Sequence, residues 1–206
     1  MPIPVRIFSD FACPFCYVGS GIIDKLSEEF DLDVAWVGRE LHPETPAEGV
    51  DVLEVVDPYD LEQATRTLRE RGAPYGLTFC DMTRLSNSRP ALEAAEFARD
   101  AGAYRAFHHA AFRAYFTEGR DIGDRAVLRA LAESCGLDPS GLDAALDDGR
   151  YRERLRAARE EADRLGVKAI PCFFIADQPR LVGAVNEDAF RERLQAAATR
   201  KILQPL

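Results

Sequence analysis

Two cysteines in the segment Cys13-Pro14-Phe15-Cys16 constrain the fold of this chain more than any other feature. The segment follows residues 5–8, a short apolar run of β-forming residues, and it precedes a stretch with helical spacing of apolar residues. Two cysteines at such a strand-to-helix turn can close a disulfide, and a helix N-terminus can stabilise the thiolate of the first. The sequence therefore predicts thiol–disulfide exchange chemistry.

The residues around the cysteines predict a β-α-β opening. Apolar side chains at helical spacing form one stripe through residues 15–30. Residues 32–37 then alternate between apolar and polar side chains around Trp36, which predicts a second strand. Because strands joined by a crossover helix run parallel, we expect these two strands to be parallel.

A long helical block follows this opening. Residues 42–58 contain several prolines, and their charged residues are all acidic, so we interpret them as an irregular, solvated connection and prefer that to a loop that faces a partner. Residues 60–165 show helical patterns nearly throughout. Helix starts are predicted at Asn87-Ser88, Asp124 and Asp138.

Sheet character returns near the C-terminus. Residues 172–175 predict a strand, and residues 181–182 predict a short second strand after a turn. Residues 187–199 predict a last helix with Phe190 and Leu194 on its inner face. The expected fold is therefore α/β, with a central mixed sheet in the order β-α-β … β-β-α and a large all-helical insertion.

The bulk composition excludes several kinds of partner. Of the 206 residues, 47% are hydrophobic, which is an ordinary composition for a folded domain. A formal net charge of −9 argues against a nucleic-acid partner. The sequence has no apolar run of membrane-spanning length and no secretory pattern at its start, so we expect a cytoplasmic protein that has no membrane partner. In a reducing compartment, a close cysteine pair is more often catalytic or metal-binding than structural.

The two cysteines are predicted to have different roles. Cys13 begins the helix, where the dipole favours a thiolate, so we predict that Cys13 is the nucleophile. Cys16 lies one turn further in and is predicted to resolve the mixed disulfide. Pro14 and Phe15 fix the turn between them. A zinc site is the alternative, but the sequence has no second CxxC or CxxH pair to complete it, and we expect no metal.

The strand–CxxC–helix start resembles the thioredoxin-fold oxidoreductases. Residues 166–171, directly before a predicted strand, are similar to the cis-proline loop that faces the cysteine pair in that fold. The resemblance implies that the backbone of Ile170 pairs with a bound substrate chain and that Pro171 packs against the disulfide. It also implies that Pro14 and Phe15 belong to the substrate-binding surface.

The size of the insertion points to the DsbA-like thiol–disulfide oxidoreductases. Residues 9–19, residues 113–123 and the late Gly183-Ala184 resemble the FrnE-type subgroup of that family. The resemblance implies a dithiol–disulfide oxidoreductase or isomerase that forms and resolves mixed disulfides with a protein or small-thiol substrate. It implies a thioredoxin-like domain made of residues 1–57 and 167–206, with residues 58–166 as the helical insertion domain.

Relatives of this subgroup suggest an alternative function. The 2-hydroxychromene-2-carboxylate isomerases and kappa-class glutathione transferases are similar in fold, but they carry serine where Cys13 stands and use bound glutathione. Retention of both cysteines favours dithiol chemistry here, while a glutathione-dependent isomerase or transferase stays the alternative. A redox-switched or metal-binding interaction module is a third hypothesis. We expect no tightly bound cofactor, with glutathione as a candidate co-substrate, and either a monomer or a homodimer.

The other cysteines are expected to be structural. Cys172 follows the proline loop within a strand, so it either lies near the active site or acts as a small buried hydrophobe, and we favour the second interpretation. Cys80 and Cys135 have no local partner and are interpreted as core thiols, with a disulfide between them as the alternative.

Several polar residues are weaker candidates. His108 and His109 are adjacent on a helix and point about 100° apart, so they do not readily share a metal. His42 has no assignable role. Asp10 either modulates a cysteine or holds a turn, and Asn87 is interpreted first as a helix cap and second as a ligand contact.

Overall fold

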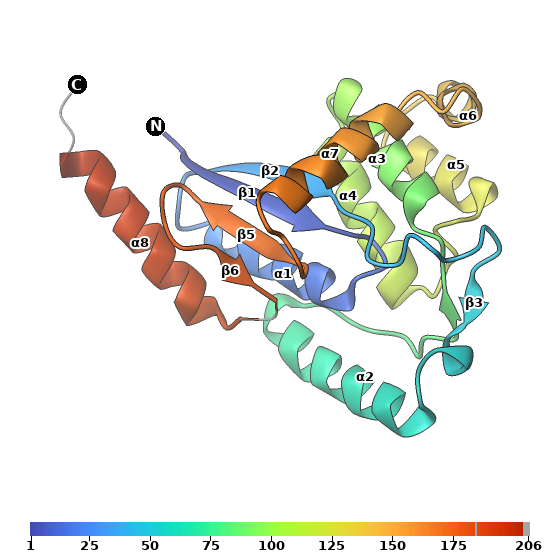
Figure 1. The fold of residues 1–206 in the computed structure, drawn as a ribbon, viewed down its shortest axis with the longest axis horizontal. Helices are drawn as coiled ribbons and strands as arrows, with labels where there is room; N and C mark the ends of the chain where they lie inside the picture. Colours follow the sequence, from blue (N-terminus) through green and yellow to red (C-terminus); the bar gives the residue numbers. More distant parts are fainter. Residues whose placement is uncertain (184, 204–206) are drawn as a thin grey trace.

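A mixed four-stranded sheet forms the centre of the fold (Figure 1), in a computed structural model that describes residues 1–183 and 185–203. Its strands are β1 (Ile3–Ser9), β2 (Leu32–Gly38), β5 (Cys172–Ile175) and β6 (Leu181–Val182), in the order β2-β1-β5-β6. Strand β2 is parallel to β1, whereas β5 is antiparallel to β1 and β6 is antiparallel to β5. The predicted mixed sheet is confirmed, while Ala184 of the motif Gly183-Ala184 lies outside the described residues.

The two faces of the sheet are covered by different helices. On one face, the buried residues Val5 and Ile7 of β1 share a core cluster with residues of α1 (Pro14–Leu26) and α8 (Glu187–Leu203). On the other face, Phe8 packs with Ala162 of α7 (Arg152–Arg164). Strand β1 is therefore buried on both faces, which explains its nearly continuous apolar sequence.

Helix α7 bears on the expected division of the chain into domains. It lies within residues 58–166, yet it covers one face of the sheet and contacts β2. The division of the chain stays a prediction, with residues 1–57 and 167–206 as one domain and residues 58–166 as the insertion. Helix α7 belongs to the predicted insertion but packs on the sheet of the other predicted domain.

The remaining helices gather beside the sheet (Figure 1). In chain order they are η1 (Val52–Glu54), α2 (Pro58–Gly72), η2 (Ala73–Tyr75), α3 (Arg89–Asp100), α4 (Tyr104–Phe112), η3 (Arg113–Thr117), α5 (Arg125–Ser134) and α6 (Pro139–Asp147). Elements η1 and η2 are short 3₁₀ helices, and η3 is a π-helical turn. The side chains of Asp124 and Asp138 each accept a hydrogen bond from a backbone N–H in the first turn of α5 and α6, so both predicted helix starts are confirmed.

A second, small sheet interrupts the helical block. Strand β3 (Val50–Asp51) pairs antiparallel with β4 (Arg84–Leu85), with Val50 opposite Leu85. The sequence predicted an irregular connection over residues 42–58 and helix nearly throughout residues 60–165, so this pairing was missed. Two-residue strands show no period of their own, and their partners lie far apart in the sequence.

Candidate redox site

The cysteine pair occupies the first turn of α1. Cys13 is the N-cap residue in an extended conformation, and Pro14 follows inside the helix, where its missing N–H leaves no intrahelical bond unmade. The backbone N–H groups of Cys16 and Tyr17 donate to the carbonyl oxygen of Cys13, at 3.0 and 3.3 Å. The local sequence thus places both sulfurs at the start of one helix, as predicted.

The two thiols are free and buried in the structure. Cys13 is 2% exposed, and Cys16 is 0% exposed. Burial, together with the neighbouring Cys13, raises the pKa of the Cys16 thiol well above its ordinary value, although Ser9 and the backbone of Asp10 act in the opposite direction. Cys16 is therefore held as a protonated thiol behind Cys13.

The proline loop faces the cysteine pair. The Ile170–Pro171 peptide is cis, and the sulfur of Cys13 lies 3.8 Å from the carbonyl oxygen of Ile170. The carbonyl oxygen of Pro171 accepts a hydrogen bond from Gly183 at 2.8 Å, which ties the loop to the end of β6. The structure thus brings together two segments that the sequence placed at opposite ends of the chain.

Gly19 allows α1 to approach this loop closely. A Cβ atom at position 19 would lie 2.9 Å from Cζ of Phe173 and 3.7 Å from Cγ of Pro171. Phe173 is fully buried and packs edge-on against Phe190, so its ring has little freedom to move away. The missing side chain of Gly19 therefore helps to set the distance between Cys13 and the proline loop.

Asp10 holds the loop that leads into the pair. Its buried carboxylate accepts hydrogen bonds from the backbone N–H of Ala12 at 3.2 Å and of Leu41 at 2.5 Å. Burial raises the pKa of Asp10, while a hydrogen bond from Ser88 opposes that rise. These contacts support the predicted role in holding a turn.

Aromatic side chains join α1 to the helical block. Tyr17 stacks on Phe112 and Phe116, with ring centroids 5.4 and 5.6 Å apart, and its hydroxyl lies 3.2 Å from Thr117 Oγ1. Phe79 meets the ring of Tyr17 edge-on. Tyr17 directly follows Cys16, so this packing fixes the position of the redox turn, a role that sequence reasoning missed.

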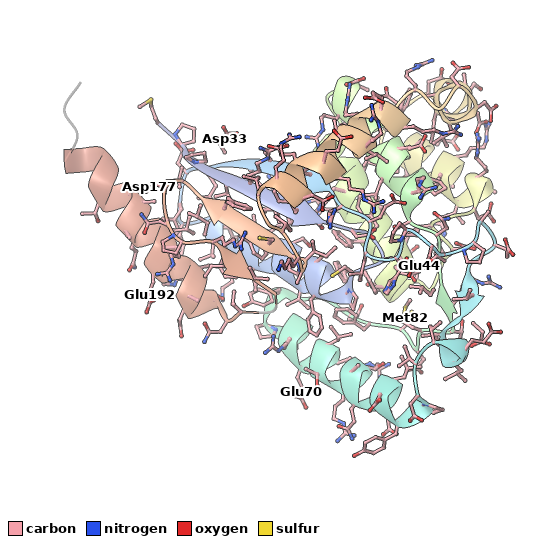
Figure 2. The ribbon with its side chains drawn as sticks, in the orientation of Figure 1. Asp33, Glu44, Glu70, Met82, Asp177 and Glu192 are labelled. Atoms are coloured by element: carbon pink, nitrogen blue, oxygen red, sulfur yellow. The ribbon has the colours of Figure 1, made fainter. Side chains whose placement is uncertain are left out.

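An apolar cavity of about 410 Å³ lies beside the redox turn. Pro14 and Ala12 form part of its wall, and the other walls come from the segment before β3, from η1 and α2, from residues 79–85 and from η3. Glu44 and Met82, two of the lining residues, are labelled in Figure 2 on the side of the molecule that carries β3. Sequence reasoning missed this cavity; the apolar residues within the predicted irregular connection were the available signal.

The predicted substrate-binding residues lie in three different settings. Pro14 borders the apolar cavity, while Ile170 and Pro171 belong to the loop that faces Cys13. Phe15 is partly buried and packs against the main core cluster. The structure therefore places the Ile170 carbonyl beside the Cys13 sulfur, Pro14 next to Cys13 in the wall of the cavity, and part of Phe15 in the core.

All five cysteines are free thiols, so the alternative disulfide between Cys80 and Cys135 is not formed in this structure. Cys80 is half-buried in the wall of the apolar cavity, and burial raises its pKa. Cys172 is fully buried opposite Phe8 in the sheet, and burial raises its pKa also, which supports the interpretation of Cys172 as a small buried hydrophobe.

The histidines have separate environments. His108 is buried against aromatic rings that include Trp36, and burial lowers its pKa well below the ordinary value. His109 lies near Asp24, and His42 lies 3.3 Å from Glu44, with both residues lining the apolar cavity. Within residues 1–183 and 185–203, no group of three or more histidine, cysteine, aspartate or glutamate side chains is arranged to hold a metal ion.

Asn87 lies one residue before Ser88, the N-cap residue of α3, and it bonds to the start of the helix, which supports its first interpretation. Its side-chain oxygen accepts a hydrogen bond from the backbone N–H of Arg89 at 3.0 Å, at the start of α3. Its amide donates to the carbonyl oxygen of Thr45 at 2.7 Å. Asn87 therefore joins α3 to the loop that borders the apolar cavity.

A strand order of β2-β1-β5-β6, with a CxxC pair at the start of α1 and a cis-proline loop opposite it, defines a thioredoxin-fold protein with a helical insertion. The family description DSBA-like thioredoxin domain matches residues 4–195, so the chain belongs to that family. Among the described residues, no helix is long and apolar enough to span a membrane.

Solved structures of similar proteins agree with this assignment. A probable DsbA oxidoreductase from Streptomyces coelicolor is 27% identical, with a TM-score of 0.88 over 99% of this chain and 92% of that one. A 2-hydroxychromene-2-carboxylate isomerase is 20% identical, with a TM-score of 0.77 over 97% and 96% of the two chains. The cytosolic disulfide reductase DsbM from Pseudomonas aeruginosa, solved with GSH, is 22% identical, with a TM-score of 0.68 over 96% and 98%. The last two likenesses show the fold alone.

Proposed function

We propose that this protein is a dithiol–disulfide oxidoreductase that acts through Cys13 and Cys16. The observation that carries the proposal is the position of the Cys13 sulfur, at the N-cap of α1 and 3.8 Å from the carbonyl oxygen of Ile170. A nucleophile at a helix start, beside a loop whose backbone can pair with a substrate chain, is suited to attack a docked disulfide.

The exchange proceeds in two steps. The Cys13 thiolate attacks one sulfur of a substrate disulfide, which forms a mixed disulfide and expels the other substrate sulfur as a thiolate. Cys16 then loses its proton and attacks the Cys13 sulfur, which forms the Cys13–Cys16 disulfide and releases the second substrate thiol. Two electrons pass from the enzyme dithiol to the substrate, and the reverse sequence oxidises a substrate dithiol.

The electrostatics favour this division of roles. Because burial raises the pKa of Cys16, its thiol stays protonated while Cys13 reacts with substrate. Resolution then needs deprotonation of Cys16 in the mixed disulfide, where the loss of the neighbouring Cys13 thiol removes one of the causes that raise its pKa.

Two surfaces support substrate docking. The Ile170 backbone, with Pro171 beside it, is proposed to pair with an extended substrate segment. Pro14 borders the apolar cavity, which offers room for a hydrophobic group next to the reacting sulfur. A protein or small-thiol substrate with an apolar group near its disulfide fits this arrangement.

Trapping of the mixed disulfide tests the assignment. A Cys16→Ser variant should accumulate a covalent adduct with a substrate disulfide in mass spectrometry, whereas Cys13→Ser should not. Insulin-reduction and dithiol-oxidation assays measure turnover in each direction, and the Cys13–Cys16 potential against glutathione indicates which direction is favoured. A Cys13→Ser variant with wild-type turnover would rule out the proposal.

A glutathione-dependent isomerase or transferase is the second candidate. The apolar cavity beside the Cys13 turn, the similarity to the chromene-carboxylate isomerase, and the GSH bound in the DsbM structure support it. Calorimetry with reduced protein and glutathione tests this candidate, because the isomerase needs a saturable glutathione site, and the absence of binding would exclude it. The description of DsbM as cytosolic supports the prediction of a cytoplasmic location.

The third hypothesis, a redox-switched or metal-binding interaction module, would be supported by equimolar zinc in the purified protein.

A further inference from the structure

A second cavity, of about 530 Å³, lies away from the redox pair and is lined by arginines. Its walls come from α3, α5, α6, α7 and the segment after β2, and Figure 1 shows these helices gathered on one side of the molecule. Five guanidinium groups border it, those of Arg89, Arg125, Arg152, Arg156 and Arg159. Neither Cys13 nor Cys16 lines this cavity, so it is separate from the cysteine pair.

The arginines are unequally paired. Three form ion pairs with neighbouring carboxylates, namely Arg89 with Glu40, Arg125 with Asp143 and Asp147, and Arg156 with Glu153 and Glu160. Arg152 has only a 3.9 Å contact with Glu93, and Arg159 forms no ion pair within the described part of the chain. Arg152 and Arg159 lie on α7 seven positions apart, which places them on the same helix face. On one wall, Arg159 is thus without an ion pair among the described residues, and Arg152 is held only by its long contact with Glu93.

Glu93 provides an unsatisfied acceptor in the same cavity. Its residue is 4% exposed, and its Oε2 atom is buried with no hydrogen-bond partner among the residues that the structure describes. A buried acceptor that stays unpaired is unfavourable for the folded chain. A ligand that brings an O–H or N–H donor to Glu93 would remove that cost.

The remaining wall is apolar. Pro90 at the start of α3, Leu146 of α6 and Leu155 of α7 line the cavity between the charged groups. Cavities of roughly 300–1,000 Å³ with apolar walls and a few convergent polar groups are typical of small-molecule sites. A carbon framework can therefore lie over these side chains while its polar groups meet the arginines and Glu93.

We propose that this cavity binds a small phosphorylated ligand that also carries hydroxyl or amino donors. The phosphate accepts hydrogen bonds from Arg152 and Arg159, whose planar guanidinium groups suit its oxygens. A donor on the carbon framework bonds to Oε2 of Glu93, and the framework packs on Leu155. Sugar phosphates and nucleotides share this chemistry.

Calorimetric titration of the protein tests the proposal. The probes are ribose 5-phosphate, AMP and methyl phosphate, of which methyl phosphate has the charged group but no hydroxyl donor. Ribose 5-phosphate or AMP should bind at least tenfold more tightly than methyl phosphate. Tighter binding of AMP than of ribose 5-phosphate would assign the site to nucleotides, and the reverse order would assign it to sugar phosphates.

Variants identify the site. The exposed pair Arg152→Ala and Arg159→Ala, combined, should weaken binding at least tenfold with an unchanged circular dichroism spectrum. Arg164→Ala is the matched control, because Arg164 lies on α7 but lines a different hollow, and it should change affinity less than twofold. Cys13→Ser should bind as the wild type does, which separates this site from the redox function.

Four results would overturn the proposal. Two concern the ligands: the absence of binding by both ribose 5-phosphate and AMP, and equal affinity for methyl phosphate and ribose 5-phosphate. Two concern the variants: a double variant that binds as tightly as the wild type would place the ligand elsewhere, and a loss in Arg164→Ala as large as in the double variant would show that only the general charge of the surface attracts anions.

Discussion

Replacement of Gly19 by alanine tests whether the missing side chain sets the distance between α1 and the proline loop. The new Cβ atom would lie 2.9 Å from Cζ of Phe173, which is fully buried. Overpacking of a core typically costs about 1–3 kcal/mol, whereas glycine to alanine within a helix gains about 1 kcal/mol. The expected result is a net destabilisation of up to about 2 kcal/mol.

Thermal and denaturant unfolding measure this difference in stability. For a chain of about 200 residues, 1 kcal/mol shifts Tm by about 2–4 °C, so Gly19→Ala should lower Tm by up to about 8 °C. The change should also slow mixed-disulfide formation, because Phe173 and Pro171 carry the loop whose Ile170 carbonyl faces Cys13.

A double-mutant cycle provides the control. Phe173→Leu shortens the side chain that the new Cβ would meet, so the two changes together should cost less than the sum of their separate effects by at least about 0.5 kcal/mol. A higher Tm for Gly19→Ala alone, as helix propensity by itself predicts, would refute the packing argument.

Three further perturbations follow from other contacts. The Tyr115 hydroxyl accepts a hydrogen bond from the Ser86 N–H at 3.1 Å and donates one to the Arg84 carbonyl oxygen at 3.0 Å. Tyr115→Phe should therefore lower the free energy of unfolding by about 1–2 kcal/mol in denaturant unfolding. An unchanged unfolding midpoint would show that β4 needs neither bond. Burial lowers the pKa of His108 in the folded protein below its ordinary value of 6.5. As pH falls below 6.5, the imidazole is protonated in the unfolded chain but not in the folded one, so the free energy of unfolding should decrease. His108→Phe should flatten that decrease by up to about 1.4 kcal/mol per pH unit in unfolding measured between pH 7 and pH 5, and an unaltered slope would contradict this origin. Val55 is an exposed residue in the wall of the apolar cavity, so Val55→Asp should raise KM several-fold for an apolar peptide disulfide. The KM for oxidised dithiothreitol should change less than twofold. Equal effects on both KM values would show that the cavity does not bind substrate.

The amino-acid sequence alone was sufficient to predict the strand and the helix that carry Cys13 and Cys16. The apolar run before Cys13 and the helical stripe after it predicted β1 and α1, and the proline loop before the strand that begins at Cys172 was identified by its resemblance to thioredoxin-fold proteins. The helix starts at Asp124 and Asp138 were also predicted correctly, because capping depends on residues within one turn of the helix.

Only the tertiary structure decided which distant residues meet. The β3–β4 pairing, the packing of α7 on the sheet, and the approach of Ile170 to Cys13 depend on contacts between segments far apart in the sequence. The same holds for the two cavities, whose walls are drawn from several elements each. Local periodicity specifies which face of an element is apolar, but it does not specify the element that packs against that face. The sequence therefore predicted the cysteine pair at a helix start, and the folded chain fixed the surroundings of the two thiols.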